Sequence, residues 1–155
     1  MTFAPWFAWR RDFDPDIWQD AVKAHAEWKS RLPELGTAVV CGTAPVDTAG
    51  ERRNRAFVFS SGSGYTEVHD KYHLPDEEGF WEATWYGRGG GDFAPQGTAG
   101  ITLGFLICTE LWFFRHARAY GDQGVHLILC PRATPRETLD KWLAGGRAAS
   151  VVSGA

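Results

Sequence analysis

One cysteine stands where an apolar run gives way to polar residues. Residues 101–107 are apolar enough to predict a buried strand, and Cys108 follows them directly, ahead of Thr109 and Glu110. A thiol at the end of a strand, beside the free N–H groups of a following helix, is favoured as a thiolate. We therefore predict that Cys108 is a nucleophile, against the plainer alternative of a small core residue.

A second segment supplies a cation and acidic residues that could act together with a thiol nucleophile. Lys71 lies just before a turn that contains Pro75, and acidic residues follow, among them Glu78 and Glu82. An ammonium group near a thiol lowers the pKa of the thiol and so favours the thiolate. The alternative for an isolated lysine is a solvated strand end.

These segments together resemble a known family. The Lys-x-His-Leu-Pro turn at 71–75, an acid near Phe80 and Trp81, and the strand ending in Ile-Cys-Thr-Glu at 107–110 resemble the nitrilase superfamily of carbon–nitrogen hydrolases. The likeness continues through 120–131, which is similar to the helix, glycine turn and following strand of that family. Within the superfamily, the run from Lys71 to Glu82 is most similar to the N-carbamoyl-amine amidohydrolases and related linear amidases.

The resemblance implies a role for each reactive group. Cys108 would attack an amide or ureido carbonyl and form a tetrahedral intermediate, then a thioester or carbamoyl-thiol, with release of ammonia. Lys71 and the backbone N–H of Thr109 would stabilise the oxyanion. Glu82 would be the supporting acid that orients Lys71, with Glu78 as the alternative. The implied reaction needs no cofactor and no metal.

Other side chains are candidates for shaping the site. Trp81, Trp85 and Trp112 flank the reactive residues and are expected to be either core residues or walls of a substrate pocket. Arg132 ends the strand predicted to run parallel to the nucleophile strand, so it is a candidate for holding a substrate carboxylate, or else a surface arginine. Glu110 is expected to orient the loop after the nucleophile.

A competing hypothesis makes three histidines into metal ligands. His69, His73 and His116 are the residues concerned. His-x-x-x-His presents two ligands on one face only in a helix, and Pro75 with the β-rich segment 65–68 argues against a helix there. Metal analysis of the purified protein distinguishes this hypothesis from the hydrolase.

Composition narrows the class of protein. The chain has 155 residues, 44% of them hydrophobic, and a net charge of −3. This charge argues against binding to nucleic acid or to an anionic membrane. No membrane span or signal segment is recognisable, so we expect a cytoplasmic protein whose partner is a small-molecule amide or N-carbamoyl substrate. The odd number of cysteines predicts free thiols, with Cys41 and Cys130 in the core. The resemblance implies a homo-oligomer at full length.

The expected elements follow from periodicity. An amphipathic helix is predicted over 16–35, starting at Asp14-Pro15-Asp16, with neighbouring strands to follow. Strand 101–107, helix and strand in that order imply a parallel pair. The remaining expected strands are 37–43, 55–60, 66–68 and 125–130, and the remaining helices 111–120 and 135–149.

The fold class is α/β. The resemblance implies a nitrilase-like α-β-β-α sandwich in which residues 1–155 form a single, partial domain, without an N-terminal strand and a C-terminal portion. The first catalytic glutamate of the family is expected just upstream of Met1, because Glu34 follows the first helix and does not replace it. Residues 1–155 alone are therefore expected to have little or no hydrolase activity. Residues 151–155 are expected to enter a buried strand. The alternative function is a non-catalytic remnant or interaction module of the same fold.

Overall fold

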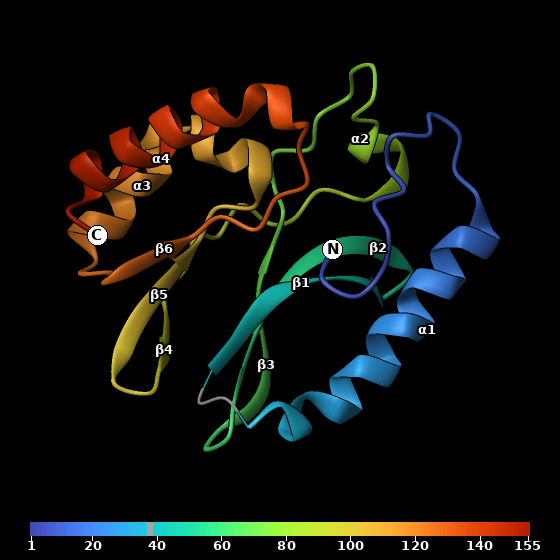
Figure 1. Ribbon diagram of the computed structural model, residues 1–155, viewed down its shortest axis with the longest axis horizontal. Helices are drawn as coiled ribbons and strands as arrows, with labels where there is room; N and C mark the ends of the chain where they lie inside the picture. Colours follow the sequence, from blue (N-terminus) through green and yellow to red (C-terminus); the bar gives the residue numbers. More distant parts are fainter. Residues whose placement is uncertain (37–38) are drawn as a thin grey trace. The chain divides into compact units, whose positions relative to one another are not determined.

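The computed structural model describes residues 1–36 and 39–155 and shows two compact units, Met1–Asp92 and Phe93–Ala155 (Figure 1). Each unit contains a three-stranded sheet. Residues 37 and 38, at the start of one predicted strand, lie outside the described part of the chain. The two units are described in turn.

The first unit begins with the predicted amphipathic helix. Helix α1 (Pro15–Arg31) runs into a 3-10 turn, η1 (Leu32–Leu35), and together they confirm the helix expected over 16–35. The Asp14 carboxylate caps the helix by accepting hydrogen bonds from the N–H groups of Asp16 and Ile17, at 3.0 and 3.2 Å. The helix therefore begins at the capping residue that the sequence predicted.

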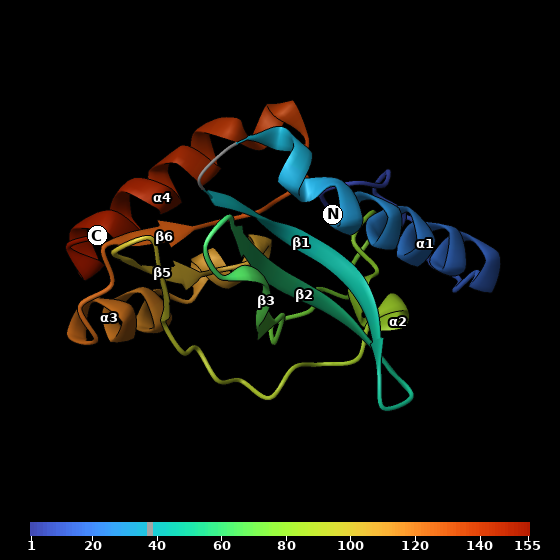
Figure 2. The ribbon, with the colours of Figure 1, turned by 90° about the horizontal axis from the view of Figure 1, so that it is seen from below.

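Three antiparallel strands follow α1 in the order β1-β2-β3. They are β1 (Val39–Thr48), β2 (Glu51–Ser60) and β3 (Gly64–Asp70), and Figure 2 shows β1 and β2 as one long hairpin. The predicted strands are confirmed as neighbours, but each is longer than expected. Polar residues extend the ladder where they pair across strands, as Asp47 does with Arg52, so alternation of apolar residues alone underestimates its length.

The core of the first unit is aromatic. Helix α1 lies along the sheet (Figure 1) and buries Trp18 and Ala21 against Phe7, Trp85 and Tyr86. The Phe7 and Trp85 ring centroids are 4.4 Å apart. Large rings of this kind supply most of the apolar area that a small unit buries.

The second unit pairs its strands in two ways. Strands β4 (Gln96–Thr98) and β5 (Ile101–Phe105) are antiparallel, whereas β5 and β6 (Leu127–Leu129) are parallel as predicted. Figure 1 shows α3 (Phe114–Asp122) and α4 (Leu139–Ser153) side by side over one face of this sheet. Two further 3-10 turns complete the unit, η2 (Cys108–Trp112) and η3 (Arg136–Thr138).

Two expectations about this unit are wrong. The helix predicted from residue 111 starts at Phe114, because η2 occupies the residues before it. Residues 151–153, expected to enter a buried strand, form the last turn of α4, and Val151 is 85% exposed. Valine has only a weak preference against the helix, so the preceding helical residues decide its conformation. Gly154, with φ +76°, then ends the helix by donating to the Ser150 carbonyl at 2.8 Å.

A buried histidine gives this fold a testable pH dependence. His25 Nδ1 lies 2.7 Å from the Ala21 carbonyl, and Nε2 accepts the Phe3 N–H at 3.1 Å, which defines a neutral ring. Burial lowers the pKa of His25 below its ordinary value, against the opposing effect of the Ala21 hydrogen bond. The unfolded chain therefore binds the extra proton more readily, so this contribution to stability is complete above about pH 6.5 and is lost as the pH falls through the folded-state pKa.

We predict that the free energy of unfolding falls between pH 7.5 and pH 5 and that His25→Gln, which keeps a donor and an acceptor, reduces this fall. Urea denaturation at a series of pH values measures it. An equal pH slope in the two proteins would contradict the prediction.

Candidate active site

Lys71 is fixed at the end of β3 by main-chain contacts on both sides. Its N–H donates to the Asn54 carbonyl at 2.9 Å, and its carbonyl accepts the Gly89 N–H at 3.0 Å. A Cβ atom at position 89 would lie 2.2 Å from the Asp70 carbonyl oxygen, so only glycine allows this approach. The glycine-rich loop thus holds the backbone of Lys71 in place.

An ion-pair network reinforces the end of the same strand. The Arg55 guanidinium binds both carboxylate oxygens of Asp70, at 2.5 and 2.8 Å, and also contacts Glu67 at 2.5 Å. These contacts, led by the Asp70 hydrogen bond, raise the pKa of Arg55, so the charge persists at any working pH. Bidentate pairing of this type fixes geometry as well as charge.

The Lys71 side chain forms a buried ion pair. Its Nζ lies 2.5 Å from Oε2 of Glu82, and both residues are only 1% exposed. Glu82 opens the short helix α2 (Glu82–Trp85), whereas Glu78, the alternative acid, lies exposed in the preceding loop. Of the two candidate acids, the structure therefore brings Glu82 to Lys71.

A tyrosine lies in the electrostatic field of this pair. Tyr86 is fully buried, and burial raises its pKa well above the usual 10, with a further contribution from the charge of Glu82. The phenol therefore stays neutral. Sequence reasoning gave Tyr86 no role.

Cys108 occupies a strained position in the second unit. It is 6% exposed and has φ +52°, a left-handed conformation that is uncommon for a residue with a side chain. Its N–H donates to the Pro131 carbonyl at 3.0 Å, just beyond the paired residues of β5 and β6. The chain turns at Cys108, where η2 begins, three residues after the end of β5.

Two buried side chains hold that turn. Glu110 is fully buried, and its Oε2 accepts the Ile107 N–H at 2.8 Å, which agrees with its expected role of orienting the loop. The Tyr120 hydroxyl bonds both the N–H and the carbonyl of Phe105, at 3.1 and 3.0 Å. Gly104 lets the Tyr120 ring approach, since a Cβ atom there would lie 2.8 Å from it.

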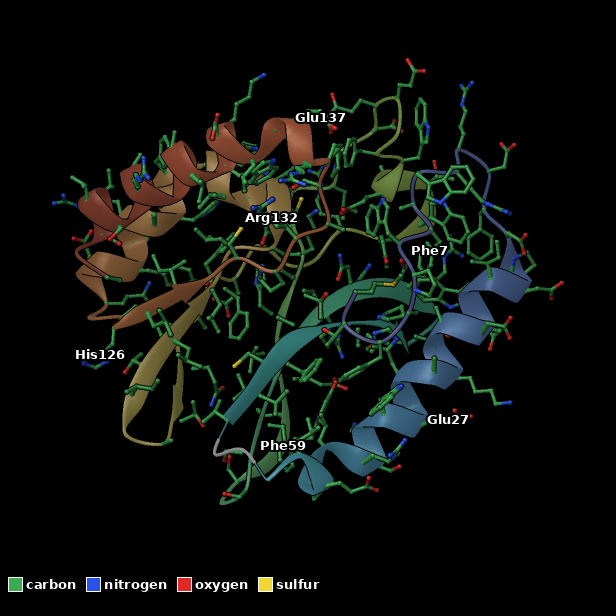
Figure 3. All side chains as sticks on the ribbon, in the orientation of Figure 1. Phe7, Glu27, Phe59, His126, Arg132 and Glu137 are labelled. Carbon is green, nitrogen blue, oxygen red and sulfur yellow. The ribbon has the colours of Figure 1, made fainter. Side chains whose placement is uncertain are left out.

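The residues around Cys108 are aromatic and cationic. Trp112 packs on Trp142 with ring centroids 4.6 Å apart, and the Arg132 guanidinium lies 5.3 Å from the Trp142 ring. Figure 3 labels Arg132 where the chain leaves β6. Arg132 is exposed and also hydrogen-bonds Thr134. An exposed cation stacked on an indole is compatible with holding a substrate anion.

The remaining sequence candidates have more ordinary surroundings. Trp85 is fully buried and donates its Nε1–H to the Arg10 carbonyl at 2.8 Å, which gives it a packing role in the aromatic core. Trp81 is partly exposed beneath the Arg11 guanidinium. Cys41 and Cys130, expected in the core, are only partly buried. Both are free thiols, as predicted.

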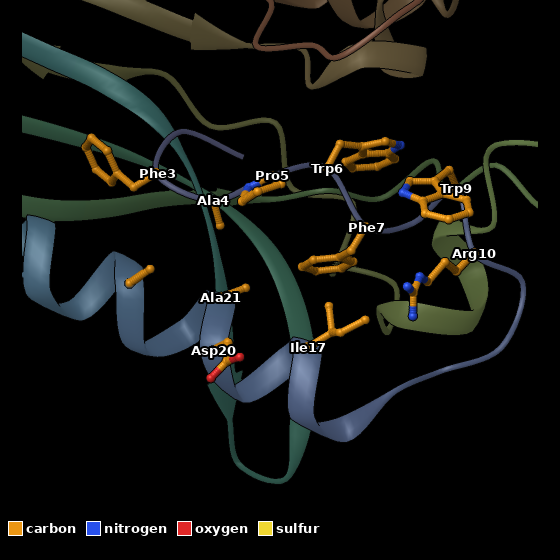
Figure 4. A pocket seen from close by; sticks show the side chains of 11 residues that line it. Phe3, Ala4, Pro5, Trp6, Phe7, Trp9, Arg10, Ile17, Asp20 and Ala21 are labelled. Atoms are coloured by element: carbon orange, nitrogen blue, oxygen red, sulfur yellow. The ribbon is translucent and has the colours of Figure 1, made fainter.

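A separate hollow in the first unit contains none of the reactive residues. It has a volume of about 410 Å³ and lies between the N-terminal segment and α1 (Figure 4). Phe3, Trp6, Phe7, Ile17 and Ala21 are among its lining residues. Its apolar character comes from the same aromatic residues that form the core.

The structure describes residues 1–36 and 39–155. They contain no group of three or more His, Cys, Asp and Glu side chains arranged to hold a metal ion. None of their helices combines the length and apolar character needed to cross a bilayer.

Residues 3–154 match the model of the carbon-nitrogen hydrolase family. Because this match covers almost the whole chain, the protein belongs to that family, and the predicted resemblance is confirmed. N-carbamoylputrescine amidases from Arabidopsis thaliana and Solanum tuberosum are 32% identical to it over 76 residues, which is 49% of this chain and 25% of each relative. The chain thus aligns with only a quarter of the length of these curated relatives.

Solved structures share the fold. A carbon-nitrogen hydrolase from Helicobacter pylori superposes with a TM-score of 0.79 and 22% identity, covering 96% of this chain and 55% of that one. An amidase from Nesterenkonia, with acrylamide added at its active-site cysteine, superposes with a TM-score of 0.69 and 20% identity, covering 90% and 56%. The predicted carbon-nitrogen hydrolase fold is therefore confirmed.

The buried ion pair makes a prediction about stability. Glu82→Leu leaves the Lys71 ammonium buried without its counter-charge, which typically costs about 3–5 kcal/mol, whereas replacing both partners removes both charges. We predict that Lys71→Met combined with Glu82→Leu is less destabilising than Glu82→Leu alone. Urea denaturation of the single and double variants tests this.

The exposed pair Arg118–Asp122, at 3.4 Å, provides the control. Asp122→Leu should change the unfolding midpoint little, because exposed ion pairs contribute little to stability. If the changes in the free energy of unfolding caused by the Lys71 and Glu82 substitutions were strictly additive, the two charges would not depend on each other and the prediction would be wrong.

Proposed function

We propose that this protein hydrolyses non-peptide carbon–nitrogen bonds, in a linear amide or an N-carbamoyl amine, with Cys108 as nucleophile. The observation that carries the proposal is the buried Lys71–Glu82 pair. A buried ion pair contributes little net stability, so its presence in a carbon-nitrogen hydrolase fits a catalytic role better than a structural one. Sequence similarity to N-carbamoylputrescine amidases supports the N-carbamoyl alternative.

The first half of the reaction forms a covalent intermediate. The Cys108 thiolate attacks the carbonyl carbon, a C–S bond forms, and the π electrons of the carbonyl move to its oxygen. The Lys71 ammonium and the Thr109 N–H stabilise this oxyanion, and loss of one such donor typically costs about 3–4 kcal/mol of barrier. The intermediate then expels protonated nitrogen as ammonia and leaves a thioester or carbamoyl-thiol.

The second half regenerates the thiol. Water attacks the carbonyl carbon bound to sulfur, and the same donors stabilise the second oxyanion. The C–S bond then breaks, a carboxylic acid or a carbamic acid is released, and a proton returns to sulfur. A carboxylate general base must carry these protons; the family resemblance implies a glutamate for this task. Glu82, paired with Lys71, orients the ammonium.

The setting of the reaction is part of the proposal. The substrate is a small molecule, and Trp81, Trp112 and Arg132 are its proposed contacts. A carboxylate on the substrate would bind the exposed guanidinium of Arg132. We place the protein in the cytoplasm as a homo-oligomer, from its sequence and its family.

The nucleophile assignment is tested by paired cysteine variants. Cys108→Ala should lower ammonia release from simple amides and N-carbamoyl amines by at least about three orders of magnitude, because the covalent route is lost. Cys41→Ala is the matched control, since Cys41 is a partly buried thiol on β1 of the first unit, and it should retain activity. These variants are made in the full-length protein. Equal activity of Cys108→Ala and the wild type would contradict the proposal, and no turnover by the full-length wild type would favour a non-catalytic module.

A further inference from the structure

One buried hydrogen-bond acceptor in the described part of β2 has no partner. Asn54 is 3% exposed, and its Oδ1 atom is buried with no hydrogen-bond partner in the described part of the chain. Leaving a buried amide oxygen unpaired is costly, and native structures rarely do so without a reason. Asparagine is also a poor strand former, so local preference does not account for it either.

The strand register places this acceptor beside the ammonium-bearing residue. Arg55 pairs with Asp70, so the next position along the ladder sets Asn54 opposite Lys71. The Lys71 N–H donates to the Asn54 carbonyl at 2.9 Å, which confirms that alignment. Directly opposed residues project from the same face of a sheet with Cβ atoms about 4.5–5.5 Å apart. The Asn54 and Lys71 side chains are therefore neighbours on that face of the sheet.

The hydrogen-bond requirements of the two side chains are complementary. An ammonium group has three N–H donors, and Glu82 accepts one of them. In the proposed reaction the oxyanion accepts a second. The third donor of this 1% exposed lysine also requires an acceptor, because a buried charge is costly unless it is fully hydrogen-bonded.

We propose that Asn54 is a positioning residue for the reaction: its Oδ1 accepts one N–H of Lys71, so that Glu82 and Asn54 together aim the remaining N–H at the oxyanion. This inference rests on the proposed function. A change of side-chain rotamer forms the contact. No atom of Asn54 touches the substrate; it acts through Lys71.

The choice of a neutral amide has a physical reason. A second carboxylate at position 54 would give Lys71 two anionic neighbours and make the group of three net negative. The potential at the oxyanion would then be less positive, and the stabilisation would weaken. An amide oxygen can orient the Lys71 ammonium by accepting a hydrogen bond and adds no charge to the group.

Kinetics of two variants test the role. Asn54→Leu keeps the size of the side chain but removes the acceptor. It should lower kcat about 10- to 100-fold with KM changed less than about threefold, because the loss is felt in the transition state. Thr98→Val is the control, since it removes a different buried oxygen, a hydroxyl, that also has no partner in the described chain and is remote in sequence from Lys71. It should leave kcat unchanged. An unchanged kcat in Asn54→Leu would overturn the proposal.

Nuclear magnetic resonance of the wild-type chain tests the contact without relying on activity or on a variant that folds. A scalar coupling across the hydrogen bond, from Lys71 Nζ to the side-chain carbonyl carbon of Asn54, is the expected result. An observed Lys71 ammonium signal that couples only to the Glu82 carboxylate would refute the contact. If the wild-type protein releases no ammonia, the proposed function fails, and this coupling still decides whether Asn54 holds the ammonium.

Discussion

The buried ion pair between Lys71 and Glu82 constrains how the end of β3 and the start of α2 are placed. Removing both charges from water is costly, and their 2.5 Å contact offsets that cost only while the two side chains stay aligned. Several otherwise separate features serve this alignment. Arg55 clamps Asp70 at the end of β3, Gly89 permits a close backbone contact, and α2 presents Glu82 at its first turn.

The second unit imposes a different constraint, which is conformational. Cys108 keeps a left-handed backbone, and such strain persists only when the surroundings determine it. The Pro131 carbonyl, two residues after β6, accepts the Cys108 N–H. The buried Glu110 carboxylate accepts the N–H of the preceding residue, Ile107, and Tyr120 bonds the end of β5. The thiol therefore sits on a rigid turn, which suits a nucleophile that must meet a carbonyl in one orientation.

Local sequence signals predicted some elements well and missed others for identifiable reasons. The first helix was predictable because its apolar period and the Asp14 cap agree. Strand β4 was missed, since Gln96–Thr98 has no strand-like pattern and owes its conformation to pairing with β5. Residues 151–153 were misassigned because β-branched residues at the end of a long helix follow the helix.

The candidate site was predictable only where a motif described it. Cys108 stood out at the end of an apolar run, and the resemblance to carbon–nitrogen hydrolases singled out Lys71 and Glu82, whose pairing depends on tertiary structure. Asn54 and Tyr86 escaped notice because neither belongs to a recognisable motif. Asn54 is a candidate because the strand register places it opposite Lys71, and Tyr86 because it is buried near Glu82. Neither placement can be predicted from the spacing of residues in the sequence.

In the proposed reaction the Lys71 ammonium and the Cys108 thiol act on one carbonyl group. A crystal structure of the protein with an acyl group trapped on Cys108 tests this most directly. We expect the acyl oxygen to lie within hydrogen-bond distance, about 3 Å, of Lys71 Nζ. A separation of more than about 10 Å between Nζ and the Cys108 sulfur, with no rotamer that closes the gap, would contradict it.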